Sequence, residues 1–231
     1  MDINELKNVL FVDLETVSNA ESFTELDEDW QKLWKKQVEQ SYRDATESPA
    51  EMYIKKASLH AEFGKIVCLG MGCFNDANGK LGFRVKVLKG DEKSILSQFK
   101  TYADKLSKLC SHNGKKFDFP YLARRAYANG VPLAEAVNVQ GKKPWETDLI
   151  DTMEMWRFGD TVYPSLNLLC KVFGIEGKGE FDGSMVHNTF YVKKDIDTIA
   201  KYCAHDVISV AKVYLKLIGE TLPPDGNFVT V

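Results

Sequence analysis

Apolar residues follow two different spacings along this chain, and the changes of spacing mark its elements. Residues 9–12 form a continuous apolar run, which predicts a strand buried on both faces. A second strand is predicted over residues 65–71, and the turn dipeptide Asn78-Gly79 joins it to residues 83–87, where apolar and basic residues alternate. These segments predict a meander with one half-exposed strand.

Helical spacing begins after Asp91 and continues, with one interruption, towards the end of the chain. The interruption is a short strand predicted over residues 109–113. The longest helix is predicted over residues 194–219, with its apolar residues in one stripe. Strands, a helix, a strand and further helices predict an α/β fold with a mixed sheet flanked by helices. Other helix signals are Pro120 near a first turn, the stop signal Asn129-Gly130, and Ser165 as the cap of a helix that ends at Gly174.

The first two predicted strands are separated by about 45 residues, which is more than an ordinary connection needs. We expect a helical insertion at residues 19–62. Two stretches resemble capping boxes, Thr24-x-x-Asp27 and Ser48-Pro49-Ala50-Glu51. The apolar stripe behind the first is expected to pack as a satellite core, and a lid or a protein-partner surface is the alternative. The stripe consists of Leu26, Trp30, Leu33 and Trp34.

The composition limits the class of protein. The 231 residues suffice for a single α/β domain over residues 1–231. The sequence has neither an apolar run of about 18 residues nor a signal-peptide pattern, so we expect a soluble, cytoplasmic protein without membrane contact. The net charge of −3 argues against nonspecific coating of nucleic acid but permits an enzyme that grips a short stretch. The five cysteines lack C-x-x-C spacing and are expected to be reduced core residues.

Two carboxylates follow the first apolar run at alternate positions. Asp13 and Glu15 should project from one face of the strand while Leu14 projects from the other. Their like charges repel unless a cation lies between them, and oxygen ligands of this kind suit Mg²⁺ or Mn²⁺. We expect both side chains to leave the core at the carboxyl end of this strand and to face a cleft.

Two further acids lie far along the chain. Asp118 lies near the start of a predicted helix, where an N-cap role is the alternative interpretation. Asp206 lies at the edge of the buried stripe of the last helix, with Tyr202 one turn earlier on the same flank. An acid at the margin of an apolar stripe needs a partner. Asp151 is interpreted mainly as a helix cap, and His205 as a residue of the solvent-facing side.

Taken in order, these three segments resemble the three motifs of the DEDD 3′–5′ exonucleases. The tyrosine variant is indicated, because the position at which the histidine variant carries its histidine is Lys201. In particular, the chain resembles the proofreading exonuclease domain of family B DNA polymerases and the stand-alone bacterial exonucleases related to it. The resemblance covers most of residues 7–218 apart from the insertion. Its motifs are Phe11-Val12-Asp13-Leu14-Glu15-Thr16, Asn113-Gly114-Lys115-Lys116-Phe117-Asp118 and Tyr202-x-x-x-Asp206.

The resemblance implies a ribonuclease-H-like fold and a two-metal phosphodiester hydrolase. It implies that two Mg²⁺ or Mn²⁺ ions are held by four carboxylates, with Tyr202 orienting the attacking water. Thr16 and Asn113 are expected near the terminal nucleotide. Leu14 and Phe117 are expected beside its base, with a core role as the alternative. The four implied metal ligands are Asp13, Glu15, Asp118 and Asp206.

The expected reaction releases nucleoside 5′-monophosphates from 3′-OH ends of single-stranded nucleic acid, with DNA favoured over RNA. Because the sequence ends at Val231, we expect no polymerase module to follow, so that any proofreading would act in trans. The alternatives are an RNA exonuclease, a catalytically silent nucleic-acid-binding module of the same fold, and an endonuclease.

Overall fold

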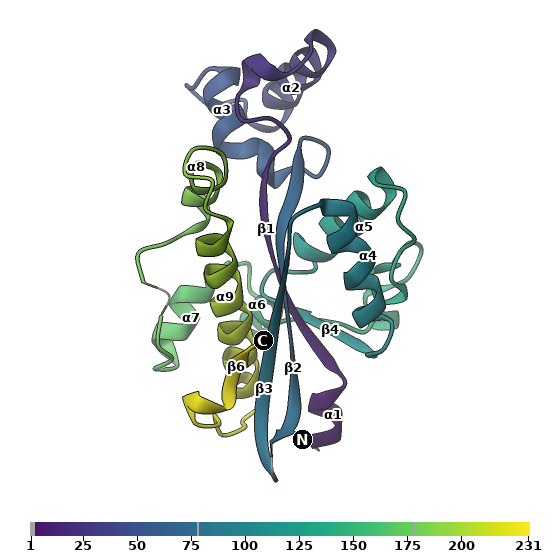
Figure 1. The fold of residues 1–231 in the computed structure, drawn as a ribbon, viewed down its shortest axis with the longest axis vertical. Helices are drawn as coiled ribbons and strands as arrows, with labels where there is room; N and C mark the ends of the chain where they lie inside the picture. The colour runs from purple at the N-terminus through teal and green to yellow at the C-terminus, as the bar shows by residue number, and fades with distance from the viewer. Residues whose placement is uncertain (1–2, 78, 178) are drawn as a thin grey trace.

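The computed structural model describes residues 3–77, 79–177 and 179–231. A six-stranded sheet runs through this part of the chain in the order β5-β4-β1-β2-β3-β6 (Figure 1). The central strand β1 pairs antiparallel with β2 and parallel with β4, so the predicted α/β fold with a mixed sheet is confirmed. The strands are β1 (Val9–Ser18), β2 (Gly64–Ala77), β3 (Lys80–Lys89), β4 (Lys108–Ser111), β5 (Leu149–Asp151) and β6 (Phe228–Thr230).

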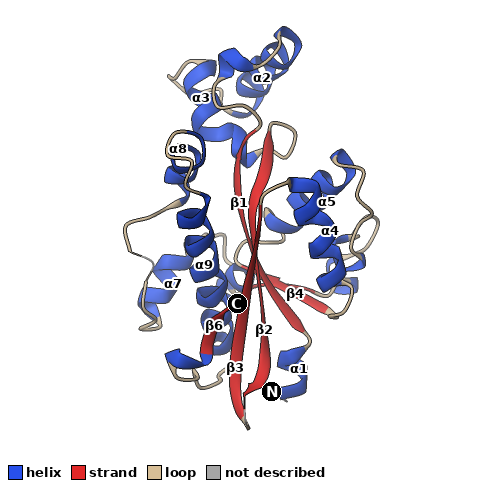
Figure 2. Ribbon diagram, viewed as in Figure 1, coloured by secondary structure: helices blue, strands red, loops and turns tan. Residues whose placement is uncertain are grey.

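Helices cover both faces of the sheet (Figure 2). Helices α4 and α5 lie on one face, and the long helix α9 lies on the other with α6 and α7 (Figure 1). The α-helices are α1 (Ile3–Lys7), α2 (Glu28–Ser41), α3 (Pro49–Lys56), α4 (Glu92–Ala103), α5 (Asp118–Ala128), α6 (Thr152–Arg157), α7 (Leu166–Val172), α8 (Val186–Tyr191) and α9 (Ile196–Leu217).

Alternate residues of β1 belong to different cores. Leu10, Val12 and Leu14 pack in the cluster that includes α4 and α5, whereas Phe11 packs in the cluster of α9. Val17 packs in a third cluster, also with residues of α9. The odd-numbered residues of β1 therefore face α9, as strand alternation requires.

Strand β1 is longer than the apolar run at its start. Its pairing with β2 continues to the pair Ser18 and Gly64, so Asp13 and Glu15 lie inside the strand. The expectation that they follow its carboxyl end was wrong. Ladder hydrogen bonds use backbone groups, so polar side chains do not end a strand.

Four strands differ from the prediction: β2 and β3 are longer than predicted, and β5 and β6 were not predicted. Strands β2 and β3 extend beyond residues 65–71 and 83–87 because they pair with each other from Cys68 and Lys89 out to Ala77 and Lys80. In the predicted turn between them, Asn78 lies outside the described residues and Gly79 has a φ of 77°. Strands β5 and β6 were not predicted, because each is too short to show an alternation.

The segment between β1 and β2 forms α2 and α3 at one end of the sheet (Figure 1). The predicted capping box at Ser48 and Glu51 is present. The box predicted from Thr24 is wrong, because Asp27 is itself the N-cap of α2 and accepts a hydrogen bond from the backbone N of Trp30. Helix α2 therefore begins later than the box implied.

Only part of the predicted apolar stripe is buried. Trp34 is fully buried and packs against the rings of Tyr53 and Phe63. Trp30 and Leu33 are 40% and 52% exposed. A satellite core therefore exists, but it is built mainly from α2, α3 and the residues just before β2 rather than from the whole stripe. The division of the chain into one domain with an insertion at residues 19–62 stays a prediction.

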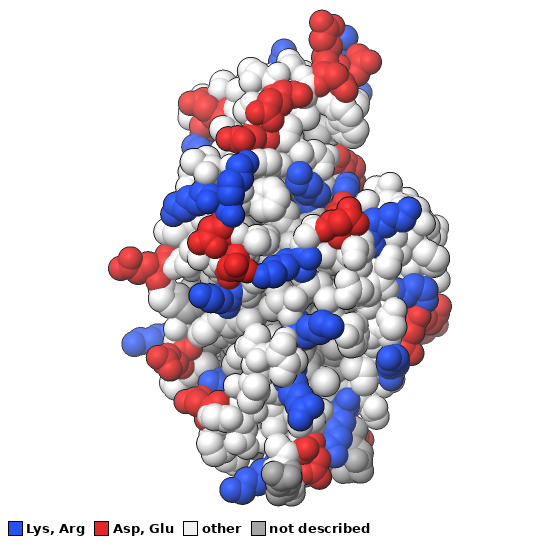
Figure 3. All heavy atoms as spheres, in the orientation of Figure 1, with Lys and Arg blue, Asp and Glu red and all other residues white. Residues whose placement is uncertain are grey.

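One face of the molecule mixes both signs of charge. On the face drawn in Figure 3, Lys and Arg side chains are interspersed with Asp and Glu side chains. Within the described ranges, no helix is long and apolar enough to cross a membrane. All five cysteines are free thiols, and Cys73 alone among them is half-buried rather than buried.

Candidate active site

A cleft of about 250 Å³ opens where β1 faces α9. It contains every residue that the sequence singled out for catalysis, metal binding or substrate binding. Those residues come from β1, from the β4–α5 connection with the first residue of α5, and from α9, which are distant in sequence. The residues are Asp13, Leu14, Glu15, Thr16, Asn113, Phe117, Asp118, Tyr202 and Asp206, and Ser58, Leu59, His112 and Gly183 complete the lining.

The first pair of carboxylates lies against α9. Ligand atoms of Asp13, Glu15 and Cys203 all lie within 4.8 Å of one another, and Glu15 is only 6% exposed. The Cys203 thiol donates to the backbone carbonyl of Asp13 across 3.5 Å. Burial raises the pKa of this thiol well above its ordinary value, so it keeps its proton. The usable ligands of this cluster are therefore carboxylate oxygens.

A glycine brings β2 close to α9 beside this pair. Gly70 is the β2 partner of Asp13, and a Cβ built on it would lie 2.6 Å from Cγ2 of Val207 and 2.9 Å from the Cys203 sulfur. Any side chain here would push α9 away from the sheet. Gly70 thus helps to hold Asp206, the neighbour of Val207, near the carboxylates of β1.

Asp118 is the first residue of α5 and is 4% exposed. The N-cap position belongs to Phe117, so the alternative of Asp118 as an N-cap is wrong. Burial raises the pKa of Asp118 to about 7, and the charge of Asp151 adds to the increase, while polar groups of Ser111 and Leu14 oppose it. A buried carboxyl group with this pKa needs a proton or a cation at neutral pH.

The loop that delivers Asp118 is held by Asp151. The Asp151 carboxylate accepts hydrogen bonds from the backbone N of Asn113 at 2.8 Å and of Lys115 at 3.1 Å. It also caps α6, as the sequence predicted, by accepting from the backbone N of Met153 at 3.0 Å. The sequence did not predict that Asp151 holds this loop, because the two backbone donors lie 38 and 36 residues away from Asp151.

The conformation of the same loop is unusual at two positions. Asn113 has a φ of 62°, in the left-handed region that asparagine tolerates better than most residues. A Cβ built on Gly114 would lie 2.5 Å from Cβ of Ser111, so only glycine fits this approach. These two residues turn the chain from β4 into α5 and direct Asp118 into the cleft.

Helix α9 contributes Tyr202 and Asp206 one turn apart. Asp206 is 5% exposed. Burial raises the pKa of the Tyr202 hydroxyl, and the negative charges of Asp206, Glu15 and Asp13 raise it further. Tyr202 therefore keeps its proton at neutral pH and offers a hydroxyl group to the carboxylate cluster.

The residues expected to contact the substrate lie in different surroundings. Leu14 belongs to the core cluster on the far face of β1, and it also lines the cleft. Phe117 is half-buried and packs against the ring of Tyr121 with centroids 5.3 Å apart. The Thr16 hydroxyl donates to the backbone carbonyl of Ser58 at 2.8 Å, which ties β1 to the segment before β2.

His112 lines the cleft but was not among the predicted site residues. One ring nitrogen lies 2.9 Å from Oγ1 of Thr152, and the other lies 2.9 Å from the backbone oxygen of Pro164. The ring is therefore fixed between α6 and the segment before α7. The sequence could have indicated His112, because it directly precedes the motif that begins at Asn113. Ser58, Leu59 and Gly183 belong to none of the three motifs.

The donor set fits divalent cations. Four carboxylates line one small cleft, and at least Glu15, Asp118 and Asp206 are buried. Their mutual repulsion is relieved when dications are bound, and Mg²⁺ and Mn²⁺ prefer carboxylate oxygen.

Comparison with known proteins gives the family. A search of curated proteins finds no match. Among solved structures, the family B DNA polymerase from the hyperthermophilic archaeon Pyrobaculum calidifontis has a similar fold, with a TM-score of 0.54 and 18% identity over 91% of this chain. The match covers 24% of the polymerase chain, so the likeness concerns the fold of one part of it. It confirms the ribonuclease-H-like fold.

The sequence itself matches a protein family over residues 58–221. That family is described as a predicted 3′–5′ exonuclease related to the exonuclease domain of PolB. The matched range contains Asp118, Tyr202 and Asp206, while Asp13 and Glu15 precede it. Because the match covers well over half of the 231 residues, this chain belongs to the family of predicted 3′–5′ exonucleases related to the exonuclease domain of PolB.

Proposed function

We propose that this protein is a metal-dependent 3′–5′ exonuclease that releases nucleoside 5′-monophosphates from the 3′-OH ends of single-stranded nucleic acid, with DNA favoured over RNA. One observation carries the proposal: four carboxylates and a tyrosine from three distant segments line one cleft. Membership of the exonuclease family supports the reaction. The preference for DNA rests on the relation of this family to DNA polymerases.

The carboxylates are the proposed metal ligands. Asp13, Glu15, Asp118 and Asp206 would hold two Mg²⁺ or Mn²⁺ ions. When bound, such ions lower the pKa of a water molecule and stabilise the charge that develops on a phosphodiester during in-line displacement. The protein's own contribution is to fix the ligands on a strand and two helices, which are more rigid than loops.

Tyr202 is proposed to orient the attacking water. Its hydroxyl is protonated at neutral pH, because burial and nearby negative charges raise its pKa. A protonated phenol is a poor general base but can both donate and accept hydrogen bonds. The ring is held in place by Phe181, whose centroid lies 4.9 Å away. Tyr202 is therefore a positioning group for the nucleophile.

A cluster of exposed aromatic and basic side chains next to the cleft supports a single-stranded substrate. Lys116 lies in the loop whose residues Asn113 and Phe117 line the cleft. Its Nζ donates to the Tyr163 hydroxyl at 2.9 Å and lies 4.4 Å from the ring centroid. Arg157 lies over the same ring, with its Cζ 4.5 Å from the centroid.

Phe158 follows Arg157 in the chain, and we group it with this cluster as the aromatic platform, defined as Lys116, Arg157, Phe158 and Tyr163. Phe158 is 93% exposed and has a φ of 47°, an unfavourable conformation for a bulky residue. A fully exposed phenylalanine contributes little to stability, because it buries almost no surface. Exposed aromatic rings beside cations bind unpaired bases and their phosphates. We infer that the single strand enters the cleft over this platform.

A cleavage assay with divalent metal tests the proposal. Purified protein with Mg²⁺ or Mn²⁺ should shorten a 5′-labelled single-stranded DNA from its 3′ end, one nucleotide at a time. Single-stranded RNA and duplexes with a mismatched 3′ end measure the preference for DNA and for unpaired ends. A circular single strand separates exonuclease from endonuclease activity, because it has no end.

The control variant in this assay is Asp206→Ala. If wild type and this variant leave the same background on DNA and RNA, the protein is not a nuclease. Binding of the strands without metal-dependent cleavage would favour the silent binding module instead. Faster degradation of RNA than of DNA would keep the mechanism and reverse the preference.

A further inference from the structure

The cleft continues beyond Thr16 into a second, larger pocket. This pocket has a volume of about 710 Å³ and shares Thr16, Ser58 and Gly183 with the cleft. Among the described residues, its lining includes none from the loop between β4 and α5. It therefore opens from the part of the cleft that Thr16, Ser58 and Gly183 line, and no residue of the aromatic platform lines it.

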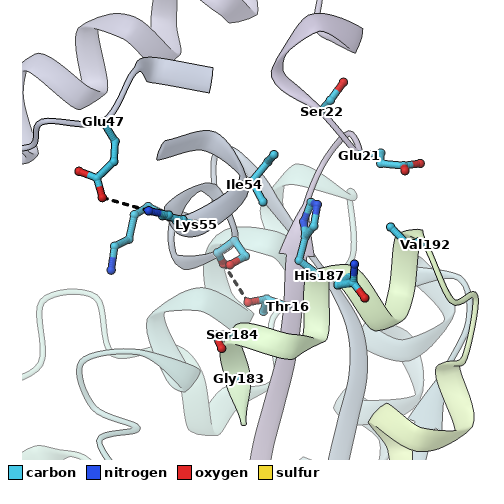
Figure 4. A pocket seen from close by; sticks show the side chains of 13 residues that line it. Thr16, Glu21, Ser22, Glu47, Ile54, Lys55, Gly183, Ser184, His187 and Val192 are labelled. Carbon is cyan, nitrogen blue, oxygen red and sulfur yellow. Dashed lines mark hydrogen bonds and ion pairs between the residues drawn. The ribbon is translucent and has the colours of Figure 1, made fainter. Parts of the chain in front are cut away.

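Two helices that are far apart in the sequence form the pocket's walls. Figure 4 shows α3, from the segment between β1 and β2, on one side and α8 on the other. Lys55 and Ile54 belong to the first wall, and His187 and Val192 to the second. The hydrogen bond from Thr16 to the backbone of Ser58 closes the floor between them.

Cationic groups gather on the α3 wall. Lys55 and Lys56 occupy the last turn of α3, and both line the pocket. Lys55 forms an ion pair with Glu47 at 3.0 Å but remains 56% exposed. Lys56 is half-buried and makes no ion pair within the described part of the chain. Two carboxylates also line the pocket: Glu47 is the partner of Lys55 on the α3 side, and Glu21 lies beside His187 on the opposite side (Figure 4).

Besides Glu21, the opposite wall offers neutral hydrogen-bonding groups. Nδ1 of His187 lies 3.2 Å from Oγ of Ser18, and the ring packs on Tyr191 with centroids 5.0 Å apart. Ser184 and Asn188 line the pocket on the same side. The end of the pocket at Lys55 and Lys56, faced by hydroxyl, amide and imidazole groups, can bind a small oxyanion.

We propose that this pocket accepts a phosphate group carried on the 3′ oxygen of the terminal nucleotide, so that the enzyme also degrades strands with 3′-phosphate ends. The inference rests on the proposed function. If the strand enters over the aromatic platform, its 3′ end points to Thr16. A plain 3′-OH end needs no room beyond the terminal ribose, whereas the structure provides a pocket with two lysines there.

The reaction on such an end is the same hydrolysis with a different product. Water attacks the phosphorus between the last two nucleotides, a P–O bond to water forms, and the bond to the 3′ oxygen of the penultimate nucleotide breaks. That oxygen leaves as a hydroxyl group after taking a proton that comes from the water. The released product is a nucleoside 3′,5′-bisphosphate, and no further reactant is needed.

The experiment compares strands that differ only at the 3′ oxygen: hydroxyl, phosphate and O-methyl. Wild type should degrade all three, and mass spectrometry should detect the nucleoside 3′,5′-bisphosphate from the phosphorylated strand. In Lys55→Ala/Lys56→Ala, kcat/KM for the 3′-phosphate strand should fall about tenfold or more relative to the 3′-OH strand, because two charge-assisted contacts are lost. The ratio of kcat/KM for the O-methyl strand to that for the 3′-OH strand should be the same in this variant as in wild type. The O-methyl group occupies the pocket but carries no charge for the lysines to bind.

The matched control is Lys35→Ala/Lys36→Ala, which removes the same charge from exposed positions of α2 outside the pocket. It should leave the ratio of 3′-phosphate to 3′-OH rates unchanged. Degradation of 3′-OH strands but not of 3′-phosphate strands would overturn the inference and keep the proposed function. Release of inorganic phosphate before chain cleavage, or an unchanged ratio in Lys55→Ala/Lys56→Ala, would also overturn it. If no strand is degraded, the proposed function fails and the inference fails with it.

Discussion

Asp13 and Glu15 present ligand oxygens within 4.8 Å of each other, although the residue between them packs in a core on the opposite face of the sheet. The strand backbone sets this arrangement, because alternate side chains share a face. Helix α9 closes over that face and brings Tyr202 and Asp206 to the same cleft. The strand thus fixes the positions of Asp13 and Glu15, and α5 and α9 bring Asp118 and Asp206 to them.

Glu15→Gln should abolish nuclease activity as fully as Asp13→Asn. Both substitutions keep the shape of the side chain and remove one negative charge from the proposed metal site. A bound metal supplies several kcal/mol of charge stabilisation, so we expect kcat/KM on single-stranded DNA to fall by about 10³-fold or more. Glu15→Gln with near-normal activity would remove Glu15 from the set of ligands. Circular dichroism of both variants checks that the fold is kept.

Mg²⁺ should raise the melting temperature of the protein, and a chelator should reverse the increase. A ligand that binds only the folded state stabilises it by about 2.7 kcal/mol at a hundred times its dissociation constant. For a chain of this size, each kcal/mol corresponds to about 2–4 °C in Tm. Differential scanning calorimetry with 10-fold steps of Mg²⁺ measures the effect.

The same titration on Asp118→Asn distinguishes a metal site from a general salt effect. This variant should gain less from Mg²⁺, because it lacks one proposed ligand. It should also be at least as stable as wild type without metal, since wild type buries a carboxyl group whose pKa is raised to about 7. An equal response of the two proteins to Mg²⁺ would argue against Asp118 as a ligand.

Tyr202→Phe should lower kcat with little change in the stabilisation by Mg²⁺. The substitution removes the hydroxyl that is proposed to orient water and keeps the ring that packs against Phe181. A positioned hydrogen-bonding group of this kind contributes about 10²-fold to rate. Single-turnover kinetics on a short DNA strand measures the chemical step. A loss confined to KM would instead assign Tyr202 to substrate binding.

Sequence reasoning succeeded where one backbone rule was sufficient. Strand alternation placed Asp13 and Glu15 on one side of β1, and helical spacing placed Tyr202 and Asp206 on one flank of α9. The fold class followed from the order of strands and helices. These inferences need only local geometry, and the structure brings all four residues into one cleft.

Other parts of the site depend on contacts that no local pattern records. Asp151 fixes the loop before Asp118 through backbone groups more than thirty residues away. Strand β5, which ends at Asp151, has only three residues and no periodicity of its own. Ser58 and Gly183 line both the cleft and the second pocket because α3 and α8 both pack against β1. Tertiary packing decides such placements, so the sequence alone could not predict them.

Acidification should weaken the packing of α2 and α3 on the sheet. Burial lowers the pKa of His60, whose Nε2 lies 2.8 Å from the Tyr42 hydroxyl and whose ring packs against Trp34. A histidine with a lowered folded-state pKa stabilises fully above its unfolded value of about 6.5, and this stability is lost as the pH falls towards the folded pKa. Each unit of pKa difference corresponds to about 1.4 kcal/mol.

Thermal unfolding followed by tryptophan fluorescence at pH 8 and pH 5 measures this loss. Trp34 is fully buried and packs against the His60 ring, so its emission responds to the loss of this packing. In His60→Gln, which cannot take up a proton, the fall in Tm between the two pH values should be smaller than in wild type. His187 also has a pKa lowered by burial, so it should account for part of the remaining fall. Equal falls in the two proteins would exclude His60 as the group responsible.

Phe158→Ala should weaken the binding of single-stranded DNA by roughly tenfold, because stacking of one base on an aromatic ring is worth about 1–3 kcal/mol. Fluorescence anisotropy with a labelled strand, in the presence of Ca²⁺ in place of Mg²⁺ to slow cleavage, measures the dissociation constant. Tyr127→Ala is the matched control, since Tyr127 is 66% exposed near the end of α5, outside the aromatic platform. Hydrolysis of the p-nitrophenyl ester of thymidine 5′-monophosphate, which lacks the upstream nucleotides that the aromatic platform is inferred to bind, should be equal in wild type and Phe158→Ala. Unchanged affinity for the strand would mean that it enters the cleft by another route, and the inferred direction of the 3′ end towards Lys55 and Lys56 would then lose its basis.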